Sequence, residues 1–596
     1  MVSMLARIVA VASLGGFLFG YDLGLVSGAL ELIVADLGTS TAQEQLVVAG
    51  AKLGAFLGAF VGAALMLSHG RRTAIALSAV PYIGGPVLMT LAPGVPLLTL
   101  GRVINGVGVG ISAVVVPAYL AEVAPAAHRG AIVSVYEVML TVGMVASQLV
   151  DLAAASGTHG GGESGEEMES AGRWRVMVGA AAVPALLLPL TPYLVPESAR
   201  WLIMKGDMPA ALAAIHRLRG AEGEVVDDVS ADEDVNMELL TLWDSVARVD
   251  AQEEEIVEQR RERLGGGDDG AELDSNGINV TPERIALQGG DASGPGRARR
   301  KLFGGGMHGA GAREPYGSFL RALVSLFGKL HELATGEERY PFWMAIGLAF
   351  ANQAVASTSI INYSTELLSE AGAEGSRLKI MLSILVTIAK GVGVSCGAYL
   401  IDRLGRRPLF VWGGFLIAGA MAGMFVAVRA SSVALTVASM SLFMLFFAGS
   451  WAGGFWVVVS EIFSMRVKSA AQAVATAALF LFGALTDVVF LSIVSVGPGG
   501  LLVFAVVAVG GGAFVWCLLP ETRGRTLEEV QAIFSAGARA QIARDKRAAG
   551  SGEAGGVGVE FAQLRPNGAQ SSSDADIVDA ENALFLSPDA RREGQC

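Results

Sequence analysis

The triplet Gly70-Arg71-Arg72 stands between two apolar stretches, and Gly405-Arg406-Arg407 repeats it about 330 residues later. Two longer patterns recur in the same order, Glu122 with Arg129-Gly130 and then Pro196-Glu197-Ser198, as Glu461 with Lys468-Ser469 and then Pro520-Glu521-Thr522. The chain therefore contains two related halves. A charged pattern that recurs between apolar stretches is typical of a membrane transporter.

The composition supports this interpretation before any motif is considered. Of the 596 residues, 52% are apolar and only 17% are charged, and the mean hydropathy is +0.52. These values are too apolar for a soluble protein of this length. We therefore expect most of the chain to lie in lipid.

Apolar stretches long enough to cross a bilayer, which needs about 20 residues per helix, occur twelve times. The first half contains six of them, at 5–32, 46–67, 73–91, 97–120, 131–152 and 176–195. The second half contains the other six, at 342–368, 380–401, 409–428, 433–459, 470–496 and 501–519. The sequence predicts an all-α polytopic membrane protein with twelve transmembrane helices in two pseudo-symmetric six-helix bundles.

Basic residues orient the predicted bundles, because short loops rich in Arg and Lys stay in the cytosol. Loops of one parity carry most of them, namely Arg71, Arg72, Arg129, Arg403, Arg406, Arg407, Arg466 and Lys468. The opposite loops carry mainly Arg377, Lys379 and Arg429. We expect a multi-pass protein with both termini in the cytosol, in the plasma membrane rather than an organelle membrane.

Four regions follow from this pattern. We expect six-helix bundles at 1–204 and 340–528, a cytosolic linker at 205–339 and a mostly disordered cytosolic tail at 529–596. Within the linker, 208–219 and 232–263 have helical character. The stretch 265–311 is rich in Gly, Asp, Ser and Arg and has few large apolar residues, so it is predicted to be disordered.

Signals for catalysis or metal binding are missing from the sequence. Cys396 and Cys517 lie in apolar stretches and Cys596 is the last residue, so their spacing suggests neither disulfides nor a metal site. There is no Gly-rich phosphate loop and no pair of catalytic carboxylates. The net charge of −13 lies mainly outside the apolar stretches, where acidic residues solvate the protein. We therefore expect no enzyme, no cofactor, no metal and no nucleic-acid partner.

Several long motifs resemble the sugar porter family of the major facilitator superfamily. They are Gly16-Phe17-Leu18-Phe19-Gly20-Tyr21-Asp22 in the first helix, Pro196-Glu197-Ser198-Ala199-Arg200-Trp201-Leu202 after the sixth, Asp402-Arg403-Leu404-Gly405-Arg406-Arg407 between the eighth and ninth, and Pro520-Glu521-Thr522-Arg523-Gly524 after the twelfth. The resemblance covers both halves but not the linker or the tail. It implies a major facilitator fold and transport by alternating access.

The resemblance also implies a set of gating residues. Arginines that follow a helix C-terminus meet the negative end of its dipole, and nearby glutamates can pair with them across the cytosolic mouth. Closing these pairs would favour the outward-facing state. The first loop carries Leu67-Ser68 where the family has an Asp-Arg pair, which predicts a weaker set in the first half. The candidates at the cytosolic mouth are Arg71, Arg72, Glu122, Arg129, Glu197, Arg200, Asp402, Arg406, Arg407, Glu461, Lys468 and Glu521. Tyr363 is the candidate at the outer gate, where Asn362-Tyr363 replaces a tyrosine pair of the family.

Asp22 and Arg102 are charged residues inside apolar stretches, where a charge costs roughly 2.5 to 3.5 kcal/mol. In the proton-coupled members of the family that the chain resembles, an Asp and an Arg at these positions interact. The Asp releases and takes up a proton, and the Arg stabilises its anion. The alternative is a static structural ion pair.

The expected solute site departs from the family pattern. Gln353 and Trp456 match positions that contact a sugar, since amides donate and accept hydrogen bonds and an indole offers an apolar face. Asn352 and Thr358 replace a glutamine and an asparagine.

Glu137 and Lys390 replace two further amides and face the central cavity in the family. One hypothesis is that they form an ion pair, which either binds a charged or strongly polar solute or opens as solute enters. The other is that they neutralise each other and preserve hexose binding.

The sequence thus predicts a secondary transporter for a small polar solute, a sugar or polyol, by proton-coupled symport within the lipid bilayer. Three alternatives stay open: a passive sugar uniporter, a nutrient sensor that does not transport, and, because of Glu137 and Lys390, a transporter of a charged polar solute.

Overall fold

A computed structural model describes most of the chain. It covers residues 4–124, 129–155, 172–219, 315–336, 338–464, 467–494 and 497–524, with short pieces at 239–240, 242–243, 247, 272–273, 279–280, 529–530 and 533–534. The described residues lie within one compact unit, Met1–Ala540.

Twelve helical spans in the described part of the chain are long and apolar enough to cross a membrane, as predicted. The first half comprises α1 (Met4–Leu37), α2 (Thr41–His69), α3 (Arg71–Leu77), α4 (Ala79–Thr90), α5 (Val95–Val123), α6 (Arg129–Ala155), α8 (Arg173–Ala180), α9 (Ala182–Ala185), η2 (Leu188–Leu190) and α10 (Thr191–Leu194). The second half comprises α16 (Arg339–Ala354), α17 (Ser357–Asn362), α18 (Ser364–Glu370), α19 (Ser376–Leu404), α20 (Arg406–Arg429), α21 (Val433–Phe447), η5 (Ala448–Ala452), α22 (Gly453–Ile462), α23 (Lys468–Val494) and α24 (Gly500–Leu518).

Three further helices lie between the halves in sequence: α11 (Ala199–Met204), α12 (Met208–Arg219) and α15 (Pro315–Thr335). Ser198 caps α11, because its hydroxyl accepts a hydrogen bond from the backbone N–H of Trp201. The helix α12 spans the residues predicted to be helical. The helix α15 packs against α2 of the first half and against α16 and α23 of the second. Its Phe327 ring stacks on Phe60 of α2, with 5.5 Å between the ring centroids.

The linker contains one departure from the predicted disorder. Strand β1 (Glu272–Leu273) pairs in antiparallel fashion with β2 (Asn279–Val280). The sequence between them includes Asn276-Gly277, a dipeptide typical of hairpin turns, and this signal was overlooked in a Gly-rich stretch. The rest of 265–311 and most of the predicted helix 232–263 and of the tail 529–596 lie outside the described residues.

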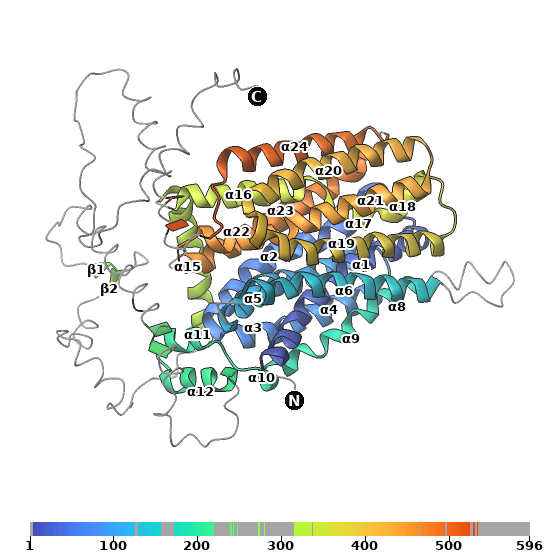
Figure 1. Ribbon diagram of the computed structural model, residues 1–596. Helices are drawn as coiled ribbons and strands as arrows, with labels where there is room; N and C mark the ends of the chain where they lie inside the picture. The colour runs from blue at the N-terminus through green and yellow to red at the C-terminus, as the bar shows by residue number, and fades with distance from the viewer. Residues whose placement is uncertain are drawn as a thin grey trace, which may run out of the picture. The chain divides into compact units, whose positions relative to one another are not determined.

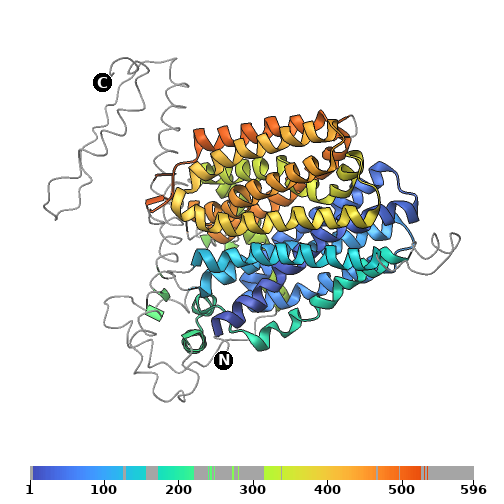
Figure 2. The ribbon, with the colours of Figure 1, turned by 45° about the vertical axis from the view of Figure 1, so that its right-hand side comes forward.

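The helices pack closely because small residues line their contacts. Within the first half α2 packs on α5 and α1 on α6, and within the second half α20 packs on α24 and α21. Between the halves, α2 lies against α23 and α6 against α19 (Figures 1 and 2). A Cβ atom at Gly54 would collide with the backbone of Val103, and one at Gly106 with the backbone of Ala51. Such glycines permit the close helix approach that is common in membranes.

Large apolar side chains are exposed on the outer surface of the helices. Val80 is 70% exposed, Trp412 68% and Val506 72%. A soluble protein rarely exposes so much contiguous apolar surface. These residues are suited to contact lipid, in agreement with the twelve spans.

The two ends of the helical spans are named here by the connections that lie there. The distal end is where α1 stops at Leu37 and α2 starts at Thr41. The basal end is where α2 gives way to α3 at Gly70 and α19 to α20 at Gly405. In Figure 1, α8 and α18 lie toward the distal end, whereas α11 and α15 lie at the basal end.

Two spans of the second half have irregular backbone. The predicted single helix 342–368 is instead divided into α16, α17 and α18. Ala356 separates α16 from α17 and adopts a left-handed conformation with φ of 58°, and Tyr363 separates α17 from α18. The predicted helix 433–459 contains the π-helical turn η5. A π turn leaves backbone groups without their usual helical partners. The side chain of Asn352 compensates, since its amide donates to the carbonyl of Trp451 at 2.9 Å.

Candidate functional site

Three polar side chains of the first half meet in the middle of the bundle. Arg102 of α5 forms an ion pair with Asp22 of α1, and Asn105 donates a hydrogen bond to the same carboxylate oxygen at 2.7 Å. The Arg102 Nε also donates to the carbonyl of Val47 on α2. Asp22 is 3% exposed and Arg102 4%. The structure thus brings together the two residues predicted to couple protons, and Asn105 is an additional partner that the sequence analysis missed.

A second buried ion pair joins the two halves. Lys52 of α2 lies 2.6 Å from Asp487 of α23, measured from Nζ to Oδ2. Lys52 also donates to the hydroxyl of Thr358 and to the carbonyl of Gly483. Neither residue was singled out from the sequence, although each is a charge within an apolar stretch. That signal was sufficient to find them.

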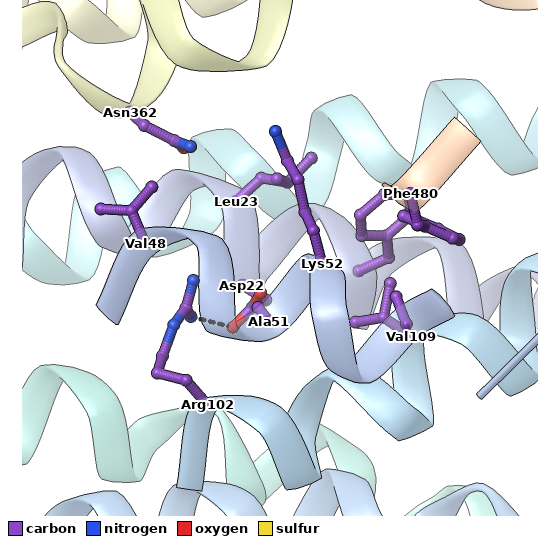
Figure 3. Close-up of a pocket in the computed structure, with 11 residues that line it drawn as sticks. Asp22, Leu23, Val48, Ala51, Lys52, Arg102, Val109, Asn362 and Phe480 are labelled. Carbon is purple, nitrogen blue, oxygen red and sulfur yellow. Dashed lines mark hydrogen bonds and ion pairs between the residues drawn. The ribbon is translucent and has the colours of Figure 1, made fainter. Parts of the chain in front are cut away.

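The two ion pairs border one small pocket. Asp22, Lys52 and Arg102 line it together with Asn362 of α17 and Phe480 of α23. Figure 3 shows Arg102 directed at Asp22, with the Lys52, Asn362 and Phe480 side chains around the same space. The pocket therefore has walls from both halves, and the Asp22 carboxylate lines it.

Glu137 and Lys390 face each other across the halves without direct contact. Glu137 of α6 accepts a hydrogen bond from the indole N–H of Trp456 at 2.9 Å. The Lys390 Nζ lies 3.4 Å from the sulfur of Met144. Their charges are near enough to interact, but among the described residues no ion pair within 4.0 Å joins them. Both side chains are buried, so a solute group placed between them would meet little competition from water.

The other predicted solute-binding residues are partly occupied by protein partners. Asn352 binds the Trp451 carbonyl through its amide, and its Oδ1 accepts from the Gln353 amide at 3.1 Å. Thr358 accepts from Lys52. Asn352 thus serves the π turn in this structure, and Thr358 serves the ion pair between halves. Solute binding by these residues stays a prediction.

A charged cluster in the first half lies at the basal end. The Arg71 guanidinium pairs with Glu122 at 2.8 Å and donates to the carbonyl of Met66 near the end of α2. Glu197 accepts from the backbone N–H groups of Arg71 and Arg72, the first residues of α3. The cluster therefore joins the end of one helix to the start of the next. Burial raises the pKa of Glu197, and the N–H groups of Ser198, Arg72 and Arg71 oppose this shift.

The second half repeats this cluster in detail. Arg406 pairs with Glu461 at 2.9 Å and donates to the carbonyl of Ile401. Glu521 accepts from the backbone N–H groups of Arg406 and Arg407 at 2.9 Å each. The linking glycines have nearly equal φ angles, 92° at Gly70 and 93° at Gly405. The repeated sequence pattern therefore forms the same charged cluster at a helix junction in each half.

The Arg71–Glu122 and Arg406–Glu461 pairs each stay within one half, which differs from the expected pairing across the basal mouth. The reason is geometric: Glu197 and Glu521 bind the helix starts that follow Gly70 and Gly405, and Glu122 and Glu461 bind the arginine side chains of the same half. Asp402 adds an exposed pair with Arg406 at 3.3 Å, one turn away on the same chain segment. The remaining candidates at this end are Arg129, which begins α6 and whose side chain lies outside the described residues, Arg200 in α11 and Lys468 at the start of α23.

Replacing Glu521 with Gln is expected to lower the thermal midpoint of the purified protein by about 1 °C. An amide accepts the two backbone N–H groups of α20 more weakly than a carboxylate, which costs about 1 kcal/mol. The matched control is Asp402→Asn, which removes an exposed pair worth little. Equal midpoints for the two variants in a thermal unfolding assay would contradict the structural role of Glu521.

Besides the contacts of Lys52 and Glu137 in the middle of the bundle, several polar contacts between halves lie at the distal end. Their partners are Thr365 with the carbonyl of Ser27 at 3.1 Å, Lys379 with Glu31 at 2.6 Å, Gln45 with Ser492 at 2.9 Å, and Gln148 with Ser383 at 3.3 Å. Tyr363, the predicted outer-gate residue, is 1% exposed and stacks on Phe490 at 5.8 Å. The structure is therefore closed at the distal end.

Glu366 of α18 is expected to give the protein a pH-dependent stability near neutrality. Partial burial and then the charges of Glu44, Glu370 and Glu31 raise its pKa from 4.5 to about 7. The folded protein therefore holds this proton more tightly than the unfolded chain, and the resulting stability is present below pH 4.5 and is lost as the pH rises through 7. Glu366→Gln should reduce the fall of the thermal midpoint between pH 5 and pH 8. The exposed Glu374→Gln serves as the control, and an unchanged pH profile in Glu366→Gln would refute the assignment.

Metal binding has no support in the described part of the chain, where no group of three or more His, Cys, Asp or Glu side chains is placed to hold an ion.

Asp151 of α6 is another buried carboxyl, with 0% exposure, and neither of its oxygens has a hydrogen-bond partner among the described residues.

A family model described as "Sugar (and other) transporter" matches residues 8–259 and 323–534. The chain belongs to this family. Among its relatives, a probable polyol transporter 3 of Arabidopsis thaliana is 28% identical over 537 residues, which cover 88% of this chain and 90% of the relative. The glucose transporter GlcP of Staphylococcus epidermidis is 26% identical over 533 residues, covering 88% and 96%. Proteins of the sugar transporter family that resemble this chain are thus transporters and not enzymes.

Solved structures of the same fold include the proton:xylose symporter XylE bound to 6-bromo-6-deoxy-D-glucose. It superposes with a TM-score of 0.64 and 22% identity, covering 89% of this chain and 99% of that one. An inward open conformation of the xylose transporter XylE from E. coli gives a TM-score of 0.62 with the same coverage. This member of the sugar transporter family therefore has the major facilitator fold and is a multi-pass integral membrane protein.

Proposed function

We propose that this protein is a proton-coupled symporter that moves a sugar or polyol across a membrane by alternating access. The observation that carries the proposal is the buried contact of Asp22 with Arg102 at a pocket whose walls come from both halves. A carboxyl that faces such a pocket can exchange a proton with an aqueous path when the halves separate. The arginine stabilises the anion after the proton leaves.

Alternating access is supported by where the contacts between halves lie. Polar contacts close the distal end, whereas the charged clusters of the basal end stay within each half. We assign the distal side to the exterior and the basal side, with both termini, to the cytosol, because the basal loops carry most of the arginines. The plasma membrane is the proposed location. On this assignment the structure is the state closed to the exterior.

The proposed solute is small and rich in hydroxyl groups. The indole of Trp456 and the amide of Gln353 suit a sugar ring, and the names of the relatives include a glucose transporter and polyol transporters. Glu137 and Lys390 add one negative and one positive site on opposite halves. They favour a strongly polar solute whose hydroxyls can bridge the two charges. The same two charges make a charged polar solute the second candidate.

Uptake into proteoliposomes tests the proposal against its alternatives. Labelled hexoses, pentoses, inositol and small organic acids are each supplied with and without a pH gradient. Accumulation that is stimulated by external acid supports symport. Equilibration that does not depend on the gradient supports a passive uniporter, and ligand binding without flux supports a sensor. The last two outcomes each overturn the proposed coupling.

A further inference from the structure

We propose that Lys52 is a gating residue, whose ammonium group binds an oxygen-lined site on the opposite half when the distal end is closed and leaves that site when the end opens. This inference rests on the proposed alternating-access transport. It assigns a role to an ion pair between halves that the coupling of Asp22 does not use.

The site that receives Lys52 is built entirely from the second half. Its acceptors are the carboxylate of Asp487 at 2.6 Å, the carbonyl of Gly483 at 3.2 Å and the hydroxyl of Thr358. An ammonium group has three donors, and three acceptors match them in number. A Cβ at residue 483 would lie 3.0 Å from the Lys52 side chain and 2.8 Å from the Gln353 amide oxygen, so the glycine leaves room for both side chains.

The same site fixes the broken seventh span. Asp487 uses its other oxygen to accept from the hydroxyl of Ser359 at 2.6 Å. Ser359 and Thr358 both belong to α17, which follows the left-handed Ala356. Lys52 therefore ties α2 of the first half to α17 and α23 of the second. A hinge-like backbone break beside an interface between halves is where movement of a short segment is expected.

Burial makes this contact sensitive to separation of the halves. The Lys52 side chain is 8% exposed and that of Asp487 is 0% exposed. While the distal end is closed, each charge depends on the other, because a lone buried charge is strongly destabilising. When the end opens, water can replace the lost partner. Arg102 belongs to the same half as Lys52, and its positive charge repels the Lys52 ammonium group. Asp487 of the second half is the group that stabilises this ammonium.

Another ion pair between halves provides the matched comparison. Lys379 of α19 contacts Glu31 of α1 at the distal rim, where the Glu31 side chain is 33% exposed. Since the Lys379 side chain is 12% exposed and that of Glu31 33%, water screens this pair more than it screens Lys52 and Asp487. Loss of Lys379 should therefore change the closed population far less than loss of Lys52.

Distances between spin labels on the two halves test the proposal without any solute. Labels are attached at Ala42→Cys and Glu374→Cys, two exposed distal positions, in full-length protein whose native Cys396, Cys517 and Cys596 are replaced, in lipid nanodiscs. Lys52→Gln and Asp487→Asn are each expected to raise the fraction of long distances by about tenfold or more. The double variant should return toward the wild-type distribution, because it leaves no lone buried charge. Lys379→Met should change the fraction by less than about threefold.

Equal distance distributions for wild type, Lys52→Gln and Asp487→Asn would overturn the proposal, and so would an equal effect of Lys379→Met. If the single variants do not fold, Thr358→Val and Ser359→Ala carry the test. Each removes one hydrogen bond of the site and should raise the long-distance fraction by about threefold, and no change in either would refute the role of Lys52. A shift in distances with no uptake of any solute would refute transport and keep this role. Normal uptake with unshifted distances would refute this role alone.

Discussion

Replacing Asp22 with Asn is expected to abolish accumulation of solute against a gradient while exchange of solute between the two sides continues. An amide cannot release or take up a proton, so the proton gradient can no longer drive the cycle. Binding and reorientation of the halves do not need that proton in an exchange experiment. The accumulation ratio should fall to about 1. Exchange should stay measurable but become slower than in wild type, because Arg102 loses its carboxylate partner while the Asn105 amide and the pocket walls remain.

The matched control for this prediction is Asp151→Asn. Asp151 is another fully buried carboxyl of the first half, but in the described structure it contacts no guanidinium group. Accumulation should survive in this variant. Proteoliposome uptake with an imposed pH gradient, followed by exchange without a gradient, separates the two activities. Acid-driven accumulation that persists in Asp22→Asn would show that the coupling carboxyl lies elsewhere.

Replacing Lys390 with Gln is expected to lower kcat/KM for the transported solute by about a hundredfold. The change removes a basic group of the opposite half that stabilises the Glu137 carboxylate, and a buried carboxylate that loses its compensating charge is destabilised by about 3–5 kcal/mol. Glu137 would then bind solute hydroxyls in an altered charge environment. We therefore expect a change in selectivity among the hexose, pentose, inositol and acid panel as well as a lower rate.

A double replacement provides the sharper comparison. Glu137→Gln with Lys390→Asn installs the amides that the family resemblance implies at these positions, and it leaves no buried charge. Uptake of neutral sugars should recover in this variant, whereas any preference for a charged solute should be lost. Initial rates across the solute panel provide the measurement. If Lys390→Gln transports with unchanged rate and selectivity, Glu137 and Lys390 are a structural pair with no role in solute recognition.

Sequence patterns anticipated the features that local chemistry decides. The spans follow from apolar length, and the ends of α2 and α19 follow from the repeated Gly-Arg-Arg triplets. The contact between Asp22 and Arg102 was anticipated from the family motif, because both positions are charged inside apolar stretches. These features depend on composition and short motifs, which one sequence displays directly.

Features that depend on three-dimensional proximity were missed. Lys52 and Asp487 are 435 positions apart, and nothing local to either residue indicates the other. The break at Ala356 was missed because alanine rarely adopts positive φ, and the surrounding contacts override this preference. Asn352 was predicted to bind solute. Its hydrogen bond to the Trp451 carbonyl could not be predicted, because it depends on the π turn.

The helix α15 rests on both halves at the basal end, on α2 through the stacked rings of Phe60 and Phe327 and on α16 and α23 through its other contacts. Any rotation of one bundle against the other must slide or lift this helix. In the proposed alternating-access cycle these contacts would break and re-form as the bundles rotate, so the strength of the Phe60–Phe327 stack would become part of the energy of that rotation.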